Sequence, residues 1–362
     1  MHSSVVPPPS ELCSAPFLAS VLRRPLSRTS ATRLSGGLSG ECSRVALFAL
    51  DGSPAGTVVI KTTAAGGGPT SAALGLAREA AFVGSPLWAQ LQRALAPGSL
   101  PAVHFAAGDL ANGRKALVLE DVGGVQAGRF FGNGSPLCWD APPLSVEDTE
   151  DGATTAEGVT RAAFALAARW HAAFWADVTL LAAKPAWLRG AAALAGSGGA
   201  DDDVGARAEW VAAQAHAARS WRATEAAIVA GTFGCTLPPR VRALVRASLR
   251  RASWEAYRGQ CAERVQSGMF TLVHGDFHPH NCMWLPAPAA AARLEGPARL
   301  VVLDYEAVGL GSGPQDLAQA RACVRACVRG AFLRGGGRCA GRRLRCLCPF
   351  PSPPPLPFIR SS

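Results

Sequence analysis

Two apolar runs that each stop at a carboxylate constrain the fold more than any other feature of this sequence. Residues 271–281 read Thr-Leu-Val-His-Gly-Asp-Phe-His-Pro-His-Asn, which predicts a short buried strand and then a tight loop set by glycine and proline. That loop holds Asp276 and Asn281 with four residues between them. Residues 300–306 read Leu-Val-Val-Leu-Asp-Tyr-Glu, which predicts a buried strand that ends at Asp304.

The three polar side chains of these loops are those that phosphoryl transfer needs. One Asp accepts the proton of an attacking hydroxyl, while an Asn and a second Asp hold Mg²⁺ against the phosphates. The protein-kinase catalytic loop has the same Asp-x-x-x-x-Asn spacing, and an Asp-led metal motif follows it. Here His-Gly-Asp stands in place of His-Arg-Asp, and Asp-Tyr-Glu in place of Asp-Phe-Gly, without a following Ala-Pro-Glu segment. We therefore expect Asp276 to be the catalytic base, Asn281 and Asp304 to bind the metal, and the acceptor not to be a protein.

This variant pattern resembles the aminoglycoside phosphotransferase and choline kinase group of small-molecule kinases, and within it the ecdysteroid-kinase-like (CHK kinase-like) branch. The resemblance covers roughly residues 34–320. It implies an α+β, two-lobed protein-kinase-like fold, with an antiparallel sheet and one helix in the N-lobe and a mostly helical C-lobe. It also implies transfer of the γ-phosphoryl group of ATP to a small-molecule hydroxyl, with ATP and Mg²⁺ as cofactors. The identity of the acceptor and the oligomeric state stay open.

A glycine-dense segment near the start of the resemblance is the first expected contact with ATP. Residues 34–49 combine a Gly/Ser turn, which includes Gly36, Gly37 and Gly40, with an apolar run. This pattern predicts a β-hairpin whose tip can approach phosphates closely, because glycine has no side chain. No Gly-Lys-Ser/Thr follows, so the segment is not a Walker motif.

A lysine at a strand end is the second expected contact with ATP. Thr-Val-Val-Ile-Lys at 57–61 predicts a β-branched strand that ends at Lys61. It resembles the Val-Ala-Ile-Lys strand whose lysine reaches the α and β phosphates. Lys61 is also one of only three lysines in a chain dominated by arginine. In the family a helix-borne Glu fixes this lysine, and Glu79 lies on the helix that we expect over 72–83.

The next two apolar runs, at 100–105 and 115–121, predict further strands. The second reads Lys-Ala-Leu-Val-Leu-Glu-Asp and resembles the last N-lobe strand of the family as it runs into the hinge. This resemblance implies that backbone groups near Glu120 and Asp121 bind the adenine edge of ATP.

The following part of the chain is expected to be mostly helical. Helical periodicity covers 160–175, 206–230 and 241–265, and a loop is expected over 197–205, which carries three consecutive aspartates. Asp316 precedes an apolar helical start, which predicts a helix N-cap.

Charge and cysteine patterns narrow the partners and the compartment. The formal net charge is +10, but residues 321–362 hold nine arginines and no acid, so the rest carries only about +1. This argues against a strong basic patch on the folded body and against a nucleic-acid partner. The cysteines outside that tail lack paired spacing, so we expect a cytoplasmic location, although the Ser/Pro/Arg-rich first 33 residues would permit organelle import. No run of 18 apolar residues occurs, so no membrane span is expected.

We expect four parts along the chain. They are an N-terminal extension at 1–33, a nucleotide-binding N-lobe at 34–121, a catalytic and acceptor-binding C-lobe at 122–320, and a tail at 321–362. The tail is rich in Arg, Cys and Pro and cannot build the helices with which the family continues. We therefore expect the tail to be disordered or non-native and the C-lobe to be truncated.

Two other interpretations stay open. His274, Asp276, His278 and His280 alternate, so an extended segment would place all four on one side, as a Zn²⁺-dependent metallohydrolase needs. Pro279 argues against a regular strand there. The other interpretation is a catalytically inactive kinase-like protein that binds nucleotide or a partner, because its C-lobe is truncated.

Overall fold

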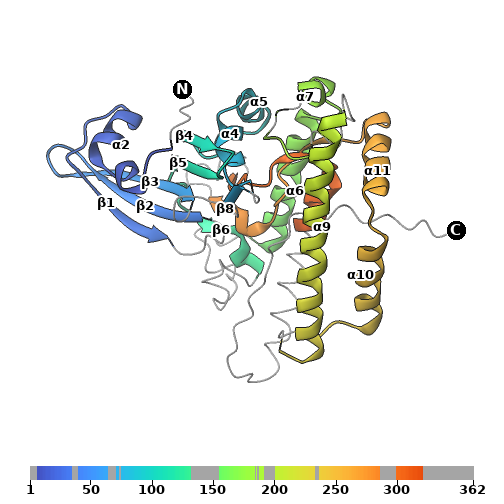
Figure 1. The fold of residues 1–362 in the computed structure, drawn as a ribbon. Coiled ribbons are helices and arrows are strands. Elements are labelled where there is room, and N and C mark those ends of the chain that lie inside the picture. Colours follow the sequence, from blue (N-terminus) through green and yellow to red (C-terminus); the bar gives the residue numbers. More distant parts are fainter. Residues whose placement is uncertain are drawn as a thin grey trace.

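The structure of this chain is a computed structural model that describes most of the first 320 residues. The described ranges are 6–34, 40–63, 71–72, 75–131, 155–183, 185, 187–190, 200–232, 236–285 and 299–320. They form a mixed α+β fold with an antiparallel sheet in the N-terminal part and mostly helices after it (Figure 1). This coarse expectation is confirmed. The expected tail at 321–362 lies outside the described residues.

The N-terminal sheet has five strands in the order β1-β2-β3-β5-β4, and all neighbours are antiparallel. The strands are β1 (Arg28–Leu34), β2 (Gly40–Phe48), β3 (Pro54–Thr63), β4 (Val103–Asp109) and β5 (Arg114–Glu120). The hairpin expected over 34–49 is present as β1 and β2, which pair in register from Arg28↔Phe48 to Leu34↔Cys42. The strand expected at 100–105 instead begins at Val103, because Pro101 has no N–H for a sheet ladder.

One face of the sheet packs against α1 (Pro9–Leu12) and α2 (Ala15–Leu22). Side chains alternate along each strand, so Val45, Val58 and Val118 point to this face and join Leu18 of α2 in one apolar cluster. The boundary that we expected between residues 33 and 34 therefore falls inside β1, and the segment before it belongs to the sheet's own core.

The other face of the sheet looks toward α4 (Arg78–Val83), which α5 (Pro86–Ala94) follows. The helix expected over 72–83 is shorter than predicted. Gly75 has φ +68°, a left-handed conformation that cannot continue an α-helix, so the regular helix begins only at Arg78. Glu79 consequently lies in its first turn.

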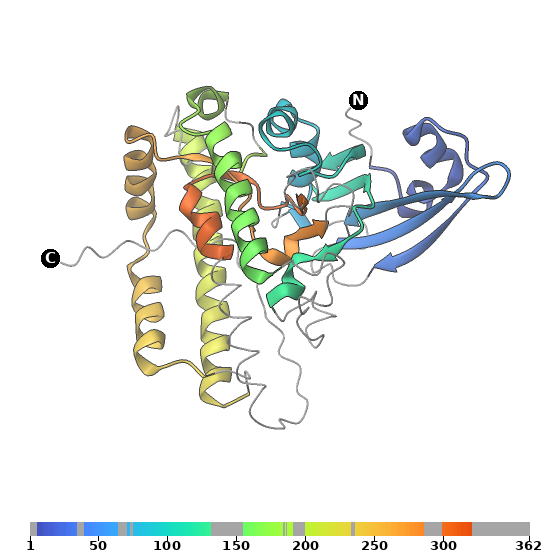
Figure 2. The same cartoon turned by 180° about the vertical axis from the view of Figure 1, so that it is seen from behind.

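The rest of the described chain consists of helices with short strands between them. The helices are α6 (Ala156–Ala173), α7 (Val178–Ala183), α9 (Ala200–Val229), α10 (Pro239–Arg251), α11 (Trp254–Gln266) and a last segment at 313–320, with the short 3₁₀ turns η2 (Ala127–Phe131) and η4 (Pro279–Asn281). The strands form two small sheets, β6 (Val125–Gln126) with β8 (Cys282–Leu285) and β9 (Arg299–Val302), and β7 (Thr271–Val273) with β10 (Gly309–Gly311). Seen from behind, the last helical segment lies beside α6 (Figure 2).

Two helical expectations are corrected. The helix expected at 241–265 is two helices, because the Ser253 hydroxyl accepts a hydrogen bond from Ala256 N at 3.1 Å and caps a new helix. The three aspartates expected in a loop at 197–205 belong to the first turn of α9.

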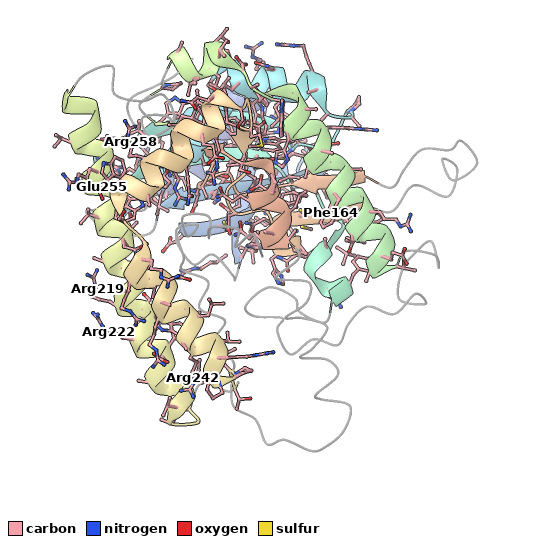
Figure 3. All side chains as sticks on the ribbon, turned by 90° about the vertical axis from the view of Figure 1, so that its right-hand side faces the viewer. Phe164, Arg219, Arg222, Arg242, Glu255 and Arg258 are labelled. Carbon is pink, nitrogen blue, oxygen red and sulfur yellow. The ribbon has the colours of Figure 1, made fainter. Side chains whose placement is uncertain are left out.

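Helices α9 and α10 form an antiparallel arm that collects arginines. Residues 214–251 contain seven arginines and one acid, Glu225, which lies 3.2 Å from Arg246. Figure 3 shows Arg219, Arg222 and Arg242 along this arm, away from Phe164 of α6. The folded body therefore has a locally basic surface, contrary to our expectation. The net charge of residues 1–320 is near zero because acidic residues outside this arm balance its arginines.

Among the described residues, no helix is both long and apolar enough to cross a membrane. The longest of them, α9, is 30 residues long but carries charged residues throughout.

Candidate active site

The loop after β7 is shaped by Gly275, which has φ +79°. A side chain at this position would collide with the carbonyl group of Ala307, so only glycine allows the two backbones to approach so closely. The predicted strand at 271–273 and the tight loop that follows it are both present. The loop bends into the 3₁₀ turn η4 at Pro279–Asn281.

Asp316 anchors this loop from the last helical segment. Its buried carboxylate accepts hydrogen bonds from His274 N at 2.8 Å and Gly275 N at 2.9 Å, and it lies 3.0 Å from Nε2 of His171 on α6. We had expected Asp316 to cap the helix, but the helix already begins at residue 313. Its carboxylate instead receives the backbone N–H groups that the tight loop leaves without a strand partner.

Asp276 projects from this loop with 40 % of its side chain exposed. Asn281 Nδ2 donates to Asp276 Oδ2 at 3.1 Å and to the Asp276 carbonyl at 2.9 Å, while Gln319 donates to Oδ1. His278 Nε2 lies 3.4 Å from Oδ2. Burial raises the pKa of Asp276, but His278, His274 and Asn281 outweigh that effect and lower it below its ordinary value. Asp276 is therefore an ionised carboxylate at neutral pH.

The backbone of Leu303 joins this loop to the second predicted one. Leu303 N donates to Asn281 O at 2.8 Å, and the Leu303 carbonyl lies 2.9 Å from Nε2 of His274. Asp276 N lies 3.3 Å from the other ring nitrogen of His274, so both nitrogens of this ring contact backbone groups of the two loops. The two strand-ended loops that we predicted thus meet, and Asp304 follows directly after the junction.

Asp304 faces Lys61 of β3. Lys61 Nζ lies 2.7 Å from Asp304 Oδ1, 2.7 Å from Glu79 Oε2 and 3.3 Å from Glu306 Oε1. Asp304 has φ +66°, an uncommon backbone conformation for a residue other than glycine. Three site residues predicted from distant parts of the sequence, Lys61, Glu79 and Asp304, are therefore in direct contact.

Two members of this cluster were missed in the sequence. Lys115 of β5 lies 2.6 Å from Glu79 Oε2 and contacts Glu306 Oε1, and its side chain is fully buried. A signal existed for Lys115, since Leu117 pairs with Lys61 and residues two apart on a strand share a face. That signal requires the β3–β5 pairing, which local patterns do not give.

Mutual pairing favours the charged forms of Lys61 and Glu79 but does not outweigh burial at Asp304. Burial lowers the pKa of Lys61, but Asp304, Glu79 and Glu306 outweigh it and hold this pKa well above its ordinary value. Burial raises the pKa of Glu79, while Lys115 and Lys61 prevail and lower it. Removal from water raises the pKa of Asp304, Lys61 lowers it and Glu306 raises it again, so the net shift is upward.

Tyr305 fixes the direction of its two acidic neighbours. Its ring is buried, stacked on Trp170 of α6 at 5.9 Å and packed against Phe82 of α4 at 5.5 Å between ring centroids. Because Tyr305 points into this core, Asp304 and Glu306 on either side of it turn toward the two lysines.

The remaining predicted nucleotide contacts have mixed outcomes. Gly36 and Gly37 lie outside the described residues. Gly40 is the first residue of β2, where a Cβ would lie 2.6 Å from Thr62 O, so it permits strand pairing. The Glu120 carboxylate accepts from Ala102 N at 3.0 Å, and Asp121 forms an ion pair with Arg44 at 2.7 Å. Both side chains thus serve the sheet, and any adenine contact in this segment falls to the backbone.

Two residues fit the predicted Mg²⁺ site. Asn281 directs its Nδ2 to Asp276, so its Oδ1 is available as a metal ligand. The Asp304 side chain is 37 % exposed, so a metal ion can reach its carboxylate. Amide and carboxylate oxygens are the ligands that Mg²⁺ prefers.

Among the described residues, only Glu79, Asp304 and Glu306 form a group of three or more His, Cys, Asp or Glu side chains with ligand atoms within 4.8 Å of one another. His274, His278 and His280 do not converge with Asp276 into such a group, because the 3₁₀ turn interrupts the extended segment that a zinc site would need.

No family model matches this chain. Neither a curated protein nor a solved structure matches it either.

Proposed function

We propose that this chain is an ATP-dependent kinase of a small-molecule hydroxyl, with the two-lobed protein-kinase-like fold that its motifs resemble in the aminoglycoside phosphotransferase and choline kinase group. One observation carries the proposal. Leu303 ties the loop of Asp276 and Asn281 to Asp304, and Asp304 contacts Lys61 of the N-terminal sheet. One continuous set of contacts thus connects the proposed base, two oxygen ligands suited to a metal ion, and an ammonium group.

In this proposal Asp276 receives the acceptor hydroxyl. An ionised carboxylate can accept a hydrogen bond from the hydroxyl, orient its oxygen and take its proton as the new bond forms. Asn281 and Gln319 hold the two carboxylate oxygens in place, and Asp316 holds the backbone of the loop. His274 links the two loops through its two ring nitrogens.

On the other side of the site, Asp304 and Asn281 would hold the metal ion, and Lys61 would contact the phosphates. Bound Mg·ATP supplies the transferable phosphoryl group and the cation that neutralises its charge. The residues of this chain contribute position and charge complementarity, which is most of what phosphoryl transfer demands of a protein.

Mg·ATP binding and acceptor phosphorylation test this proposal separately. We expect Mg·ATP, but not ATP with a chelator, to raise the thermal midpoint. ATP consumption screened over sterols, amino alcohols and sugars then identifies an acceptor. Asp276→Asn should lower turnover by about 10²–10⁴-fold and leave the Kd for Mg·ATP nearly unchanged. Asp304→Asn should weaken Mg·ATP binding itself.

Asp51→Asn is the matched control, because Asp51 is an exposed residue of the β2–β3 turn. Asp51→Asn should change neither the turnover nor the Kd for Mg·ATP. A wild-type chain that shows no Mg²⁺-dependent response to ATP, or an Asp276→Asn variant with full turnover, would overturn the proposal.

A further inference from the structure

We propose that Lys115 is a positioning residue for the nucleotide: it retains Glu79 and Glu306 so that Lys61 and Asp304 can engage Mg·ATP. This inference rests on the proposed function and deepens it. It assigns a role to a buried lysine that the phosphoryl-transfer machinery described above does not use.

The two lysines share the same carboxylate oxygens. Glu79 Oε2 lies 2.6 Å from Lys115 Nζ and 2.7 Å from Lys61 Nζ, and Glu306 Oε1 contacts both ammonium groups. Lys61 also reaches Asp304, at 2.7 Å. Lys61 is therefore the member of the pair that connects the buried carboxylates to the more exposed one.

Solvent exposure separates the lysines in the same way. The Lys115 side chain is 0 % exposed, Lys61 is 12 % exposed and Asp304 is 37 % exposed. A nucleotide phosphate or a metal ion can therefore approach Asp304 and Lys61, whereas Lys115 lies behind them and serves as a fixed counter-charge.

Charge balance explains why a second lysine is needed. Three carboxylates face two ammonium groups in this cluster. If Lys61 turns to a phosphate, Glu79 and Glu306 still have Lys115 as a partner. Without Lys115, the same movement would take the remaining ammonium group away from the buried Glu79 carboxylate, which is strongly unfavourable. Lys61 would then stay with Glu79 and Glu306, and the affinity for the nucleotide would fall.

The frame around Lys115 keeps it in place. Its backbone N–H donates to Thr63 Oγ1 at 2.8 Å, and the Thr63 hydroxyl donates in turn to Gly113 O at 3.0 Å. On the opposite side, Arg78 donates to the Glu306 carbonyl at 2.9 Å. Both sides of the Lys115–Glu306 contact are thus anchored by the backbone.

The test compares Lys115→Met with the double variant Lys115→Met/Glu306→Gln, which restores the charge balance by removing one carboxylate charge. The Kd for Mg·ATP is measured by calorimetry well below the thermal midpoint, and the midpoint is measured without nucleotide. We expect Lys115→Met to weaken Mg·ATP binding at least tenfold, and Glu306→Gln to recover at least threefold of that loss. Affinity below wild type should persist in the double variant, because Glu79 still lacks Lys115.

Arg114→Met is the matched control. Arg114 neighbours Lys115 on β5 but donates to Val6 O at 3.1 Å, away from the cluster. Arg114→Met should lower the thermal midpoint without changing the Kd for Mg·ATP. Lys115→Met would give the same result if the role of Lys115 were purely structural. If Lys115→Met does not fold, the double variant decides, since a Kd equal to wild type overturns the inference. A wild-type chain that fails to bind Mg·ATP overturns the proposed function as well, whereas binding that is unchanged in the variants overturns this inference alone.

Discussion

The two halves of the candidate active site solve the problem of holding a carboxylate in different ways. In the half next to the N-terminal sheet, Glu79 and Glu306 are held by opposite charges, the ammonium groups of Lys61 and Lys115. In the loop after β7, Asp276 is held by amide and imidazole groups, and no lysine or arginine in the described part of the chain pairs with it.

This difference teaches which perturbation each half resists. The ion pairs of the first half require that their side chains stay charged. Glu79 and Lys61 stay charged near neutral pH, because pairing lowers the pKa of Glu79 and raises that of Lys61. The loop depends on backbone shape and on histidines, a side-chain type that gains positive charge in acid. The first half should respond to loss of a charge, and the second to steric crowding and acid.

The largest stability effect is expected from Glu79→Ala, because it removes the carboxylate shared by two lysines. Lys115 has no exposed surface through which water could replace that partner. Breaking a buried ion pair in this way costs about 3–5 kcal/mol of unfolding free energy. The loss should be nearly constant from pH 6 to 8, as measured by urea denaturation.

Glu157→Ala is the control for that measurement. Glu157 pairs with Arg161 one helical turn away on an exposed surface, with 73 % and 80 % of the two side chains accessible. Its loss should be about 0.5 kcal/mol or less. Equal losses in the two variants would contradict the view that Glu79 stabilises the chain as the buried partner of Lys61 and Lys115.

A smaller effect is expected from crowding the loop. Gly275→Ala should destabilise the chain by about 2–4 kcal/mol, because it combines a left-handed backbone with a collision at the Ala307 carbonyl. Gly231 also has a left-handed backbone, with φ +69°, but a Cβ there would have nothing within 4 Å. Gly231→Ala should therefore lower the unfolding free energy only by the backbone strain, about 1 kcal/mol. The comparison thus separates crowding from strain. A Gly231 variant as unstable as the Gly275 variant would show that the approach to Ala307 is not what requires glycine.

Local sequence patterns identified the loop half of the site better than the charged cluster. Asp276 and Asn281 lie five residues apart on one loop, so their contact follows from a short spacing. Lys115 and Glu306 contact each other over a separation of 191 residues, and only the tertiary fold brings β5 and the segment after β9 together. Patterns of apolar and turn residues carry no information about such a pairing.

The fold shows the same limit in its helices. Periodicity predicted helical structure over 241–265, yet the range contains two helices, and the Ser253 hydroxyl caps the second one. The start of α9 was missed as well, since three consecutive aspartates resemble a solvated loop in the sequence, whereas α9 begins at Ala200. The apolar pattern on which the predictions rested is silent at both boundaries.

The smallest expected effect is an acid sensitivity that belongs to the loop. Burial and, to a smaller extent, the charge of His278 lower the pKa of His280, Asp276 opposes both, and the net result is a pKa of about 4. An unfolded His has a pKa of about 6.5, so between these values the unfolded chain binds the proton and the folded chain does not. Stability from this group is therefore complete above pH 6.5 and is lost as the pH falls toward 4. Between pH 7 and pH 5 the loss amounts to about 2 kcal/mol.

His280→Gln removes this titration, so the difference in unfolding free energy between pH 7 and pH 5 should be about 2 kcal/mol smaller in the variant than in the wild type. Urea denaturation in the presence of a chelator measures it, because a bound cation would add its own charge to the loop. An identical pH dependence in wild type and His280→Gln would mean that the charged pairs next to the N-terminal sheet, and not the loop, carry the acid response, which would reverse the contrast between the two halves of the site.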